Sequence, residues 1–140
     1  MASLILSLLA AALACVPVLL IWEAAVAAGG ALGSMARYLA VNGLAVWLGR
    51  AFPYGTLAVN VAGSFLMGVA LAMLVQRGWL GEPWRAGLMA GLLGGFTTFS
   101  AFAGETLVLA QQRPAAAALN VGLNMVLCLA AVWVGAKLAG

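Results

Sequence analysis

The stretch "GGFTTFSAF", residues 94–102, interrupts one of the long apolar runs of this chain. Its two adjacent glycines weaken a helix, because glycine loses more backbone freedom on ordering than any other residue. Thr97 and Thr98 follow, and their hydroxyls compete for the hydrogen bonds of the backbone. The stretch therefore predicts a helix that breaks near residues 94–98.

The composition of the whole chain is typical of a membrane protein. Hydrophobic residues make up 66%, charged residues only 6%, and the mean hydropathy is +1.17, whereas a soluble domain is about 25% charged. The six Lys and Arg residues form no basic cluster, so we expect no nucleic-acid partner. With no His, no Asp and no nucleophile–base pair, an enzyme is not expected. The separated Cys15 and Cys128 predict neither a disulfide framework nor a metal site.

Four apolar runs are long enough to cross a bilayer, which takes about 20 residues. The predicted helices are 24–49, 56–75, 86–110 and 115–136. The sequence thus predicts an all-α membrane protein whose third helix is broken mid-membrane, and we assign residues 24–140 to this four-helix domain.

Residues 1–23 form an N-terminal apolar extension ahead of that domain. Three interpretations stay open for it: an extra helix, a signal-like segment, or an extension of the first helix. Pro17 argues against one unbroken helix through this region, because proline removes a backbone hydrogen bond and clashes with the preceding turn.

The positive charges of the loops are nearly balanced between the two sides of the membrane. If the four helices alternate in direction, Arg77, Arg85 and Lys137 lie on one side, and Arg50 and Arg113 on the other. Orientation normally follows an excess of Lys and Arg on the cytoplasmic side. Three against two leaves two interpretations open, a chain oriented by another feature and a chain that inserts both ways up.

Polar side chains inside the apolar runs carry the functional signal. Arg37 and Glu105 are ionisable residues within predicted spans, and such residues indicate a functional site by default. For Arg37 a structural role is favoured, because a buried guanidinium ties helices together, for example by pairing with Glu105. Asn60, Asn120 and Asn124 add amide groups, the last two on one helix face. Amides that simply hold membrane helices together are the alternative.

A break at residues 94–98 would expose backbone groups within the membrane, which is tolerated only inside protein or beside a watery cavity. Freed carbonyls can ligate a cation, and freed N–H groups can meet an anion. Phe99 and Phe102, three residues apart, lie on one helix face. The edge of a phenyl ring is electropositive and can face an anion, although ordinary helix packing is the alternative.

Three motifs follow one another in the order "GGALGSMARY" (29–38), "GTLAVNVAGSF" (55–65) and "GLLGGFTTFSAF" (91–102), with Glu105 behind the third. Over about residues 24–137, this order and spacing resembles the CrcB/Fluc family of fluoride channels. Ala101 departs from the family, which often has Thr there.

The resemblance implies a fluoride-selective channel in the cell inner (plasma) membrane, crossing it several times. It implies passive efflux of cytoplasmic fluoride and hence fluoride resistance. The family forms an antiparallel, dual-topology homodimer with two fluoride pathways. A structural Na⁺ lies at the dimer centre, and by the family motif the backbone carbonyls that hold it are those of Gly94 and Thr97.

The resemblance also implies roles for particular side chains. Those on the fluoride pathway are the amide donor Asn60, the ring edges of Phe99 and Phe102, the hydroxyls of Thr98 and Ser100, the third-helix Glu105, and the fourth-helix polar residues Asn120 and Asn124. Arg37 matches the first-helix arginine of the family and is assigned a structural role.

Two other classes of function remain open from the sequence. A small dual-topology multidrug exporter is also a short four-helix dimer, and it depends on a membrane-embedded glutamate, for which Glu23 and Glu105 are candidates. A non-transporting subunit of a membrane assembly is the third possibility. Neither class requires the stretch "GGFTTFSAF".

Overall fold

The computed structural model describes the backbone of residues 2–140 and the side chains of residues 20–140. Four helical stretches are long and apolar enough to cross a membrane: Leu20–Leu48, Tyr54–Gln76, Trp84–Gln112 and Pro114–Ala139. The prediction of an all-helical chain with four spans is confirmed, and the chain is a multi-pass membrane protein. The third stretch exceeds the predicted 86–110 by two residues at each end.

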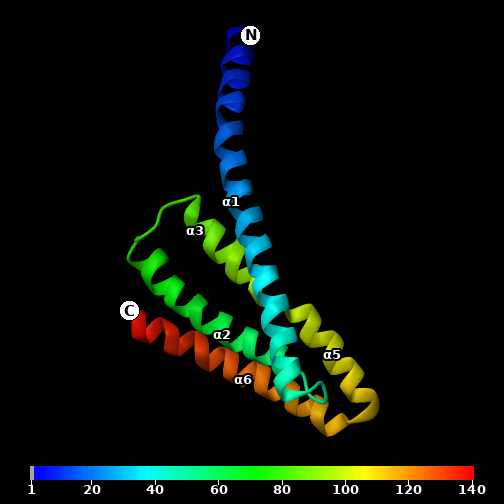
Figure 1. Cartoon of the computed structure of the whole chain (residues 1–140). Helices are drawn as coiled ribbons and strands as arrows, with labels where there is room; N and C mark the ends of the chain where they lie inside the picture. Colours follow the sequence, from blue (N-terminus) through cyan, green and yellow to red (C-terminus); the bar gives the residue numbers. More distant parts are fainter. Residues whose placement is uncertain (1) are drawn as a thin grey trace.

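The first span is the C-terminal part of a longer helix, α1, which comprises Ala2–Leu48. Helical backbone continues through Pro17, so the expected interruption there is wrong; leucine- and alanine-rich turns on both sides offset the one hydrogen bond that proline lacks. The first part of α1, blue in Figure 1, extends past the other helices. Met1 lies outside the described residues, and the domain boundary after residue 23 stays a prediction.

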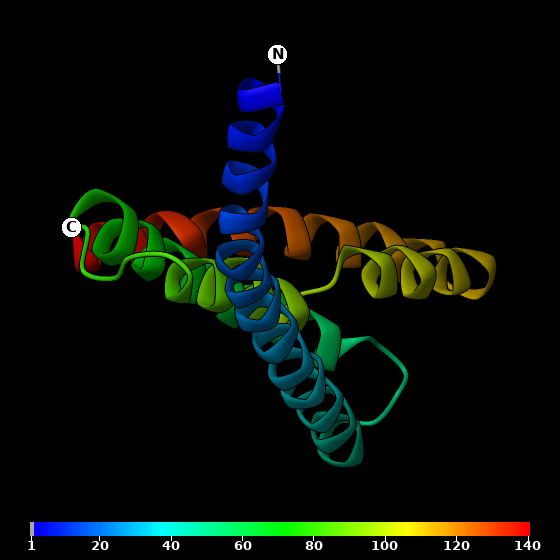
Figure 2. The same cartoon turned by 90° about the horizontal axis from the view of Figure 1, so that it is seen from above.

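The second and fourth spans lie side by side and run in the same direction (Figures 1 and 2). The second comprises α2, Tyr54–Ala70, and the π-helical segment η1, Leu71–Gln76, whereas the fourth is the single helix α6, Pro114–Ala139. Glycine allows their close approach, since a Cβ atom on Gly68 would lie 2.1 Å from the Val132 carbonyl oxygen.

The third span is divided into four segments: α3 (Trp84–Ala86), the π-helical η2 (Gly87–Leu93), α4 (Gly94–Phe96) and α5 (Phe99–Gln112). Helix α1 packs directly on η2 and α4. A Cβ on Gly29 would lie 2.1 Å from the Gly87 oxygen, and one on Gly33 would lie 2.1 Å from the Leu92 oxygen. The glycines of "GGALGSMARY" therefore bring the two backbones into contact.

Two extended residues separate α4 from α5. Thr97 has φ −83° and ψ 156°, and Thr98 has φ −152° and ψ 116°. The hydroxyl of Thr98 then accepts a hydrogen bond from the Ala101 N–H at 3.2 Å and caps the first turn of α5. The interruption therefore coincides with the two threonines of "GGFTTFSAF".

Burial in the described part of the chain is the reverse of that in a soluble protein. Large apolar side chains such as Val46 and Trp47 are more than 80% exposed, as suits helices that face lipid or another protein. The buried apolar side chains are few and mostly small: Val59, Ala70, Ala72, Leu93, Phe102 and Ala117. Four buried side chains are polar, namely Thr56, Thr98, Asn120 and Asn124, and they lead to the site.

Candidate functional site

The interruption between α4 and α5 is held by a side chain from α2. Asn60 Nδ2 donates to the carbonyl oxygen of Thr98 at 3.2 Å, and the Thr98 N–H donates to Asn60 Oδ1 at 2.8 Å. An extended residue in the middle of a helical span lacks its usual backbone partners, which would be costly to leave unpaired. The Asn60 oxygen replaces the helical acceptor that the Thr98 N–H has lost, and the Asn60 nitrogen adds a donor to the Thr98 carbonyl, which as N-cap already accepts the first bond of α5.

A directed series of hydrogen bonds continues from Asn60 into α6 and α5. Asn60 Nδ2 donates to Asn124 Oδ1 at 3.1 Å, and Asn124 Nδ2 donates to Asn120 Oδ1 at 3.0 Å. Asn120 Nδ2 donates to Thr106 Oγ1 at 2.8 Å, and the Thr106 hydroxyl donates to the Phe102 carbonyl at 2.7 Å. Asn120 and Asn124 are almost fully buried, so these partners are needed to offset their loss of hydration.

Two phenyl rings lie beside this network. The ring centroids of Phe99 and Phe102 are 5.4 Å apart with planes at 61°, an edge-to-face arrangement. Phe102 is buried, whereas Phe99 is 71% exposed in the single chain. Both rings, with Asn60, Thr98 and Asn124, line a cavity of about 340 Å³. We call this the amide–phenyl cavity.

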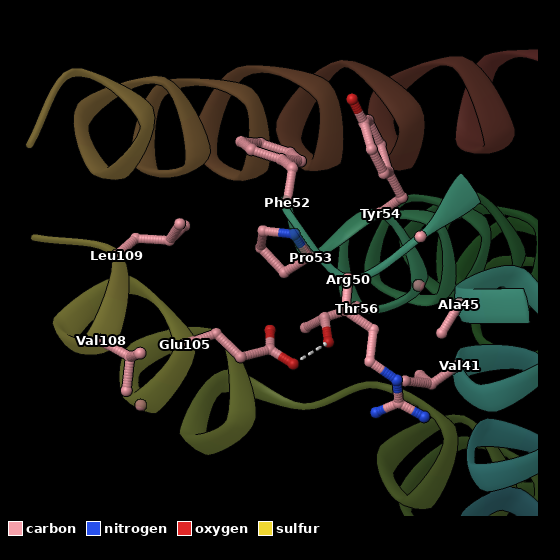
Figure 3. Close-up of a pocket in the computed structure, with 13 residues that line it drawn as sticks. Val41, Ala45, Arg50, Phe52, Pro53, Tyr54, Thr56, Glu105, Val108 and Leu109 are labelled. Atoms are coloured by element: carbon pink, nitrogen blue, oxygen red, sulfur yellow. Dashed lines mark hydrogen bonds between the residues drawn. The ribbon is translucent and has the colours of Figure 1, made fainter. Parts of the chain in front are cut away.

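A second cavity, of about 530 Å³, lies between the end of α1, the α1–α2 loop and α5 (Figure 3). Glu105 and Thr56 face one another across it, and the Thr56 hydroxyl donates to Glu105 Oε1 at 2.8 Å. The other carboxylate oxygen, Oε2, is buried without a hydrogen-bond partner among the described residues. Arg50 also lines this cavity, and its guanidinium lies on the side away from Phe52 in Figure 3.

A third cavity, of about 270 Å³, shares lining residues with each of the other two. It shares Thr56 and Glu105 with the cavity of about 530 Å³, and it shares Thr98 with the amide–phenyl cavity. Arg37 lines it as well. Polar groups therefore follow one another from the end of α1 to the interruption.

Arg37 and Glu105 line the same cavity without forming the ion pair that the sequence suggested. Among the described side chains, the recorded ion pair is Arg85 with Glu82 at 2.7 Å, in the turn before α3.

The interruption frees backbone carbonyl groups of residues 94–97, among them those of Gly94 and Thr97. In a continuous helix the Thr98 N–H would bond to the Gly94 oxygen and the Ala101 N–H to the Thr97 oxygen. Here the Thr98 N–H donates to Asn60 and the Ala101 N–H to the Thr98 hydroxyl. The Gly94 and Thr97 carbonyls thus lose these helical partners, and they are the two carbonyls assigned to a cation from the sequence.

The structure brings most of the sequence-predicted residues together around the interruption. Asn60, Thr98, Phe99, Phe102 and Asn124 share one cavity, and the Ser100 hydroxyl lies 3.3 Å from that of Thr98. Asn120 lies behind them and lines none of the three cavities.

Two hydroxyls at the site were missed from the sequence, that of Thr56, which bonds to Glu105, and that of Thr106, which bonds within the network. Thr56 had a usable signal, because it lies one helical turn before Asn60 and so on the same face. Thr106 had none beyond its place next to Glu105, since a lone threonine in an apolar run commonly bonds only to its own helix.

Comparison with known proteins agrees with the family resemblance of the three sequence motifs. The family described as "CrcB-like protein, Camphor Resistance (CrcB)" matches residues 24–136. A Methylococcus capsulatus protein named "Fluoride-specific ion channel FluC" is 56% identical over 116 residues, which cover 82% of this chain and 51% of that protein. Proteins of the same name from Aeromonas salmonicida and Shewanella amazonensis are 52% and 51% identical, each match covering 81% of this chain and 91% of the relative. This chain therefore belongs to the CrcB-like family.

Proposed function

We propose that this chain is a fluoride-specific ion channel. Its relatives carry that name at more than half identity, and the amide–phenyl cavity supports the same activity. The observation that carries the proposal is the chemistry of that cavity: amide, hydroxyl and ring-edge groups line it, and none of its described lining residues is charged.

Such a lining suits a small, strongly hydrated anion. To enter, fluoride must exchange water for fixed donors at little cost, and to leave it must not be held too tightly. The amide of Asn60 and the electropositive edges of Phe99 and Phe102 are neutral donors of this kind. A lysine or arginine in their place would bind the anion strongly and slow its release.

The transport that this site supports is passive. Hydrogen fluoride crosses membranes as a neutral molecule and dissociates in the neutral cytoplasm, which traps fluoride there. A channel in the cell inner (plasma) membrane lets the anion leave down its electrochemical gradient, and fluoride resistance follows.

The functional unit of the proposal is an antiparallel homodimer with its two copies in opposite orientations. The three-to-two division of loop charges supports dual topology. The 71% exposure of Phe99 supports a partner, because half of that ring pair is open at the surface of a single chain. In this dimer the interruption at Thr97 and Thr98 lies at mid-membrane and faces protein rather than lipid.

A structural Na⁺ at the dimer centre fits the backbone at the interruption. The Gly94 and Thr97 carbonyls have lost their helical N–H partners, and carbonyl oxygen is a ligand that hard cations prefer. These two carbonyls from each copy would hold the ion. When bound, it supplies a positive charge between the two subunits.

Fluoride efflux from proteoliposomes containing the purified protein tests the proposal. Vesicles loaded with potassium fluoride receive valinomycin, and a fluoride electrode follows release. Rapid fluoride release with little chloride release from matched potassium chloride vesicles is expected. Release no faster than from protein-free vesicles contradicts the proposal. Efflux of a cationic drug without fluoride release would instead identify a small multidrug exporter, for which Glu105 is the membrane-embedded carboxylate.

A further inference from the structure

We propose that Thr106 and Asn120 are positioning residues that, through a four-residue hydrogen-bond relay, Asn60–Asn124–Asn120–Thr106, stabilise the orientation of the Asn60 carboxamide that the Thr98 N–H fixes at the other end. The relay is inferred from the geometry alone, whereas its effect on fluoride flux rests on the proposed function. Neither Thr106 nor Asn120 lines the amide–phenyl cavity. They can reach a permeating anion only through the residues that do.

The direction of the hydrogen bonds is fixed at the Asn60 end of the relay. The Thr98 N–H can only donate, so the Asn60 atom that faces it at 2.8 Å must be the oxygen. The Asn60 nitrogen is then turned towards Asn124 and the Thr98 carbonyl. Asn124 must therefore present its own oxygen to Asn60.

The opposite end imposes the same polarity independently. The Phe102 carbonyl can only accept, so the Thr106 hydroxyl spends its single proton on it at 2.7 Å. The Thr106 oxygen is left as an acceptor, and Asn120 must turn its nitrogen towards it at 2.8 Å. The Asn120 oxygen then faces Asn124 and accepts from its nitrogen at 3.0 Å.

Because the middle of the relay is buried, the hydrogen-bond directions fixed at its two ends also constrain the residues between them. Asn120 is 1% exposed and Asn124 is 2% exposed, so water cannot substitute for a lost partner. If Asn120 turned over, its nitrogen would face the nitrogen of Asn124, and two donors would oppose one another. Asn124 Nδ2 would keep only its second acceptor, the Asn120 backbone carbonyl at 3.0 Å, so the middle link of the relay would be weakened. The hydroxyl on α5 thus supports, from the far end of the relay, the orientation of the α2 amide that the Thr98 N–H fixes at the near end.

The relay also joins the two kinds of group that line the cavity. Its first end is the Asn60 amide, and its last acceptor is the backbone of Phe102, whose ring lines the same cavity. The amide donor and the backbone of Phe102 are therefore linked through Asn124, which lines the cavity, and through Asn120 and Thr106, which do not.

Three variants in fluoride efflux test this arrangement. Thr106→Val keeps the size and branching of the side chain but removes the hydroxyl, and we expect a decrease of about tenfold because a buried amide loses its acceptor. Thr106→Ser restores the hydroxyl and should conduct within about twofold of wild type. Asn120→Leu interrupts the relay at the next link, and the double variant Thr106→Val/Asn120→Leu should be no worse than Asn120→Leu alone, because residues that act as one unit are not additive.

A second measurement does not depend on conduction. The chain contains four asparagines, Asn42, Asn60, Asn120 and Asn124, so selective ¹⁵N-asparagine labelling gives only four side-chain amide groups. In wild-type protein the amides of the three relay asparagines should exchange with deuterium slowly. Asn42, which is outside the relay and bonds only to Tyr38, should exchange fast. In Thr106→Val, exchange at Asn60 should accelerate at least about tenfold.

The outcomes separate this inference from the proposed function. Wild-type protein that releases no fluoride contradicts the channel, while the exchange rates still decide on the relay. Fast exchange at Asn60 in wild-type protein overturns the relay whether or not any variant assembles. Multiplying losses in the double variant, equal losses in Thr106→Val and Thr106→Ser, or an unchanged Asn60 amide in Thr106→Val overturn it as well.

Discussion

Asn60 and Thr98 are 38 residues apart in the chain, yet they pair as two β-strand residues would, with one hydrogen bond in each direction. The carboxamide supplies the donor and the acceptor that a neighbouring strand would otherwise provide. A single side chain thus stabilises extended backbone within a helical membrane span. Both Nδ2 hydrogens of Asn60 are engaged, one by the Thr98 carbonyl and one by Asn124 Oδ1, so donation to an anion exchanges one of these bonds.

Replacement of Asn60 by Ala should lower fluoride flux by well over tenfold, because the anion loses a donor and the Thr98 N–H loses its acceptor. An unpaired buried polar group costs about 1–3 kcal/mol, so the variant should also unfold at lower temperature in detergent. Efflux from proteoliposomes and thermal unfolding measure the two effects. Asn42→Ala is the control, since Asn42 bonds only to Tyr38 of its own helix. Wild-type flux in Asn60→Ala would contradict a role in the fluoride pathway and would leave Asn60 with helix packing only.

Lysines in the turn between α5 and α6 should abolish dual topology. Gln111→Lys with Gln112→Lys gives that side of the membrane the larger positive charge, and the positive side stays in the cytoplasm. Trp79→Cys, made with Cys15 and Cys128 replaced by Ser, reports the orientation through an impermeant maleimide. About half of the copies should be labelled from outside without the lysines, and nearly all with them.

Fluoride resistance should be lost when the lysine variant is expressed alone, because all copies then face one way. Co-expression with a copy biased in the opposite direction should restore it. Labelling of all or none of the copies without the added lysines would defeat the antiparallel dimer.

Replacement of Na⁺ by N-methylglucamine on both sides, with time for exchange, should slow fluoride flux. Thr97→Ala should change this sodium dependence little, because only the Thr97 backbone is proposed as a ligand and its hydroxyl bonds to the Leu93 carbonyl. Gly94→Val should weaken it strongly, since β-branching restricts the backbone there.

The structure also supplies the control for the Gly94 substitution. A Cβ on Gly94 would meet only the Met89 oxygen, at an ordinary 3.7 Å, so Gly94→Ala fits within one subunit. A decrease in Gly94→Val therefore reports on the backbone or on the partner. Full flux without Na⁺, together with no density at the dimer axis, would remove the central ion.

Gly33→Ala should destabilise the protein far more than Gly43→Ala, although both lie in α1. A Cβ on Gly33 would lie 2.1 Å from the Leu92 carbonyl oxygen, whereas one on Gly43 meets nothing within 4 Å. Overpacking against backbone costs about 1–3 kcal/mol or more, and alanine in an open helical position gains about 0.5–1 kcal/mol. Unfolding in detergent checks the difference. Equal stability of the two variants would contradict the close contact of α1 with η2.

The four spans could be predicted from the sequence because apolar length alone defines them. The role of the glycines could not. Gly94 and Gly95 were expected to weaken the helix, but both are helical, and the extended residues are Thr97 and Thr98. A Cβ on Gly95 would lie 2.7 Å from the Gly30 oxygen, so that glycine serves the contact with α1. Such a contact depends on which helices pack together, and composition does not contain that information.

The site was predictable to the extent that polar side chains are conspicuous in apolar runs. Asn60 and Asn124 are conspicuous in this way, and they meet at one cavity. Their partners were not predictable. Thr106 meets Asn120 only because α5 packs on α6, and a threonine without this contact would have the same sequence neighbours.

The relay from Asn60 to Thr106 has a consequence for protons. A proton wire needs groups that both take up and release H⁺, such as carboxylate or imidazole side chains or ordered water molecules. An amide nitrogen has no free lone pair for a proton, and neither amide nor threonine ionises near neutral pH. The polar groups beside the amide–phenyl cavity can therefore turn an anion-binding face towards fluoride without conducting H⁺ along themselves. In the proposed cycle, protons then enter only with hydrogen fluoride through the lipid, and none travels along these side chains.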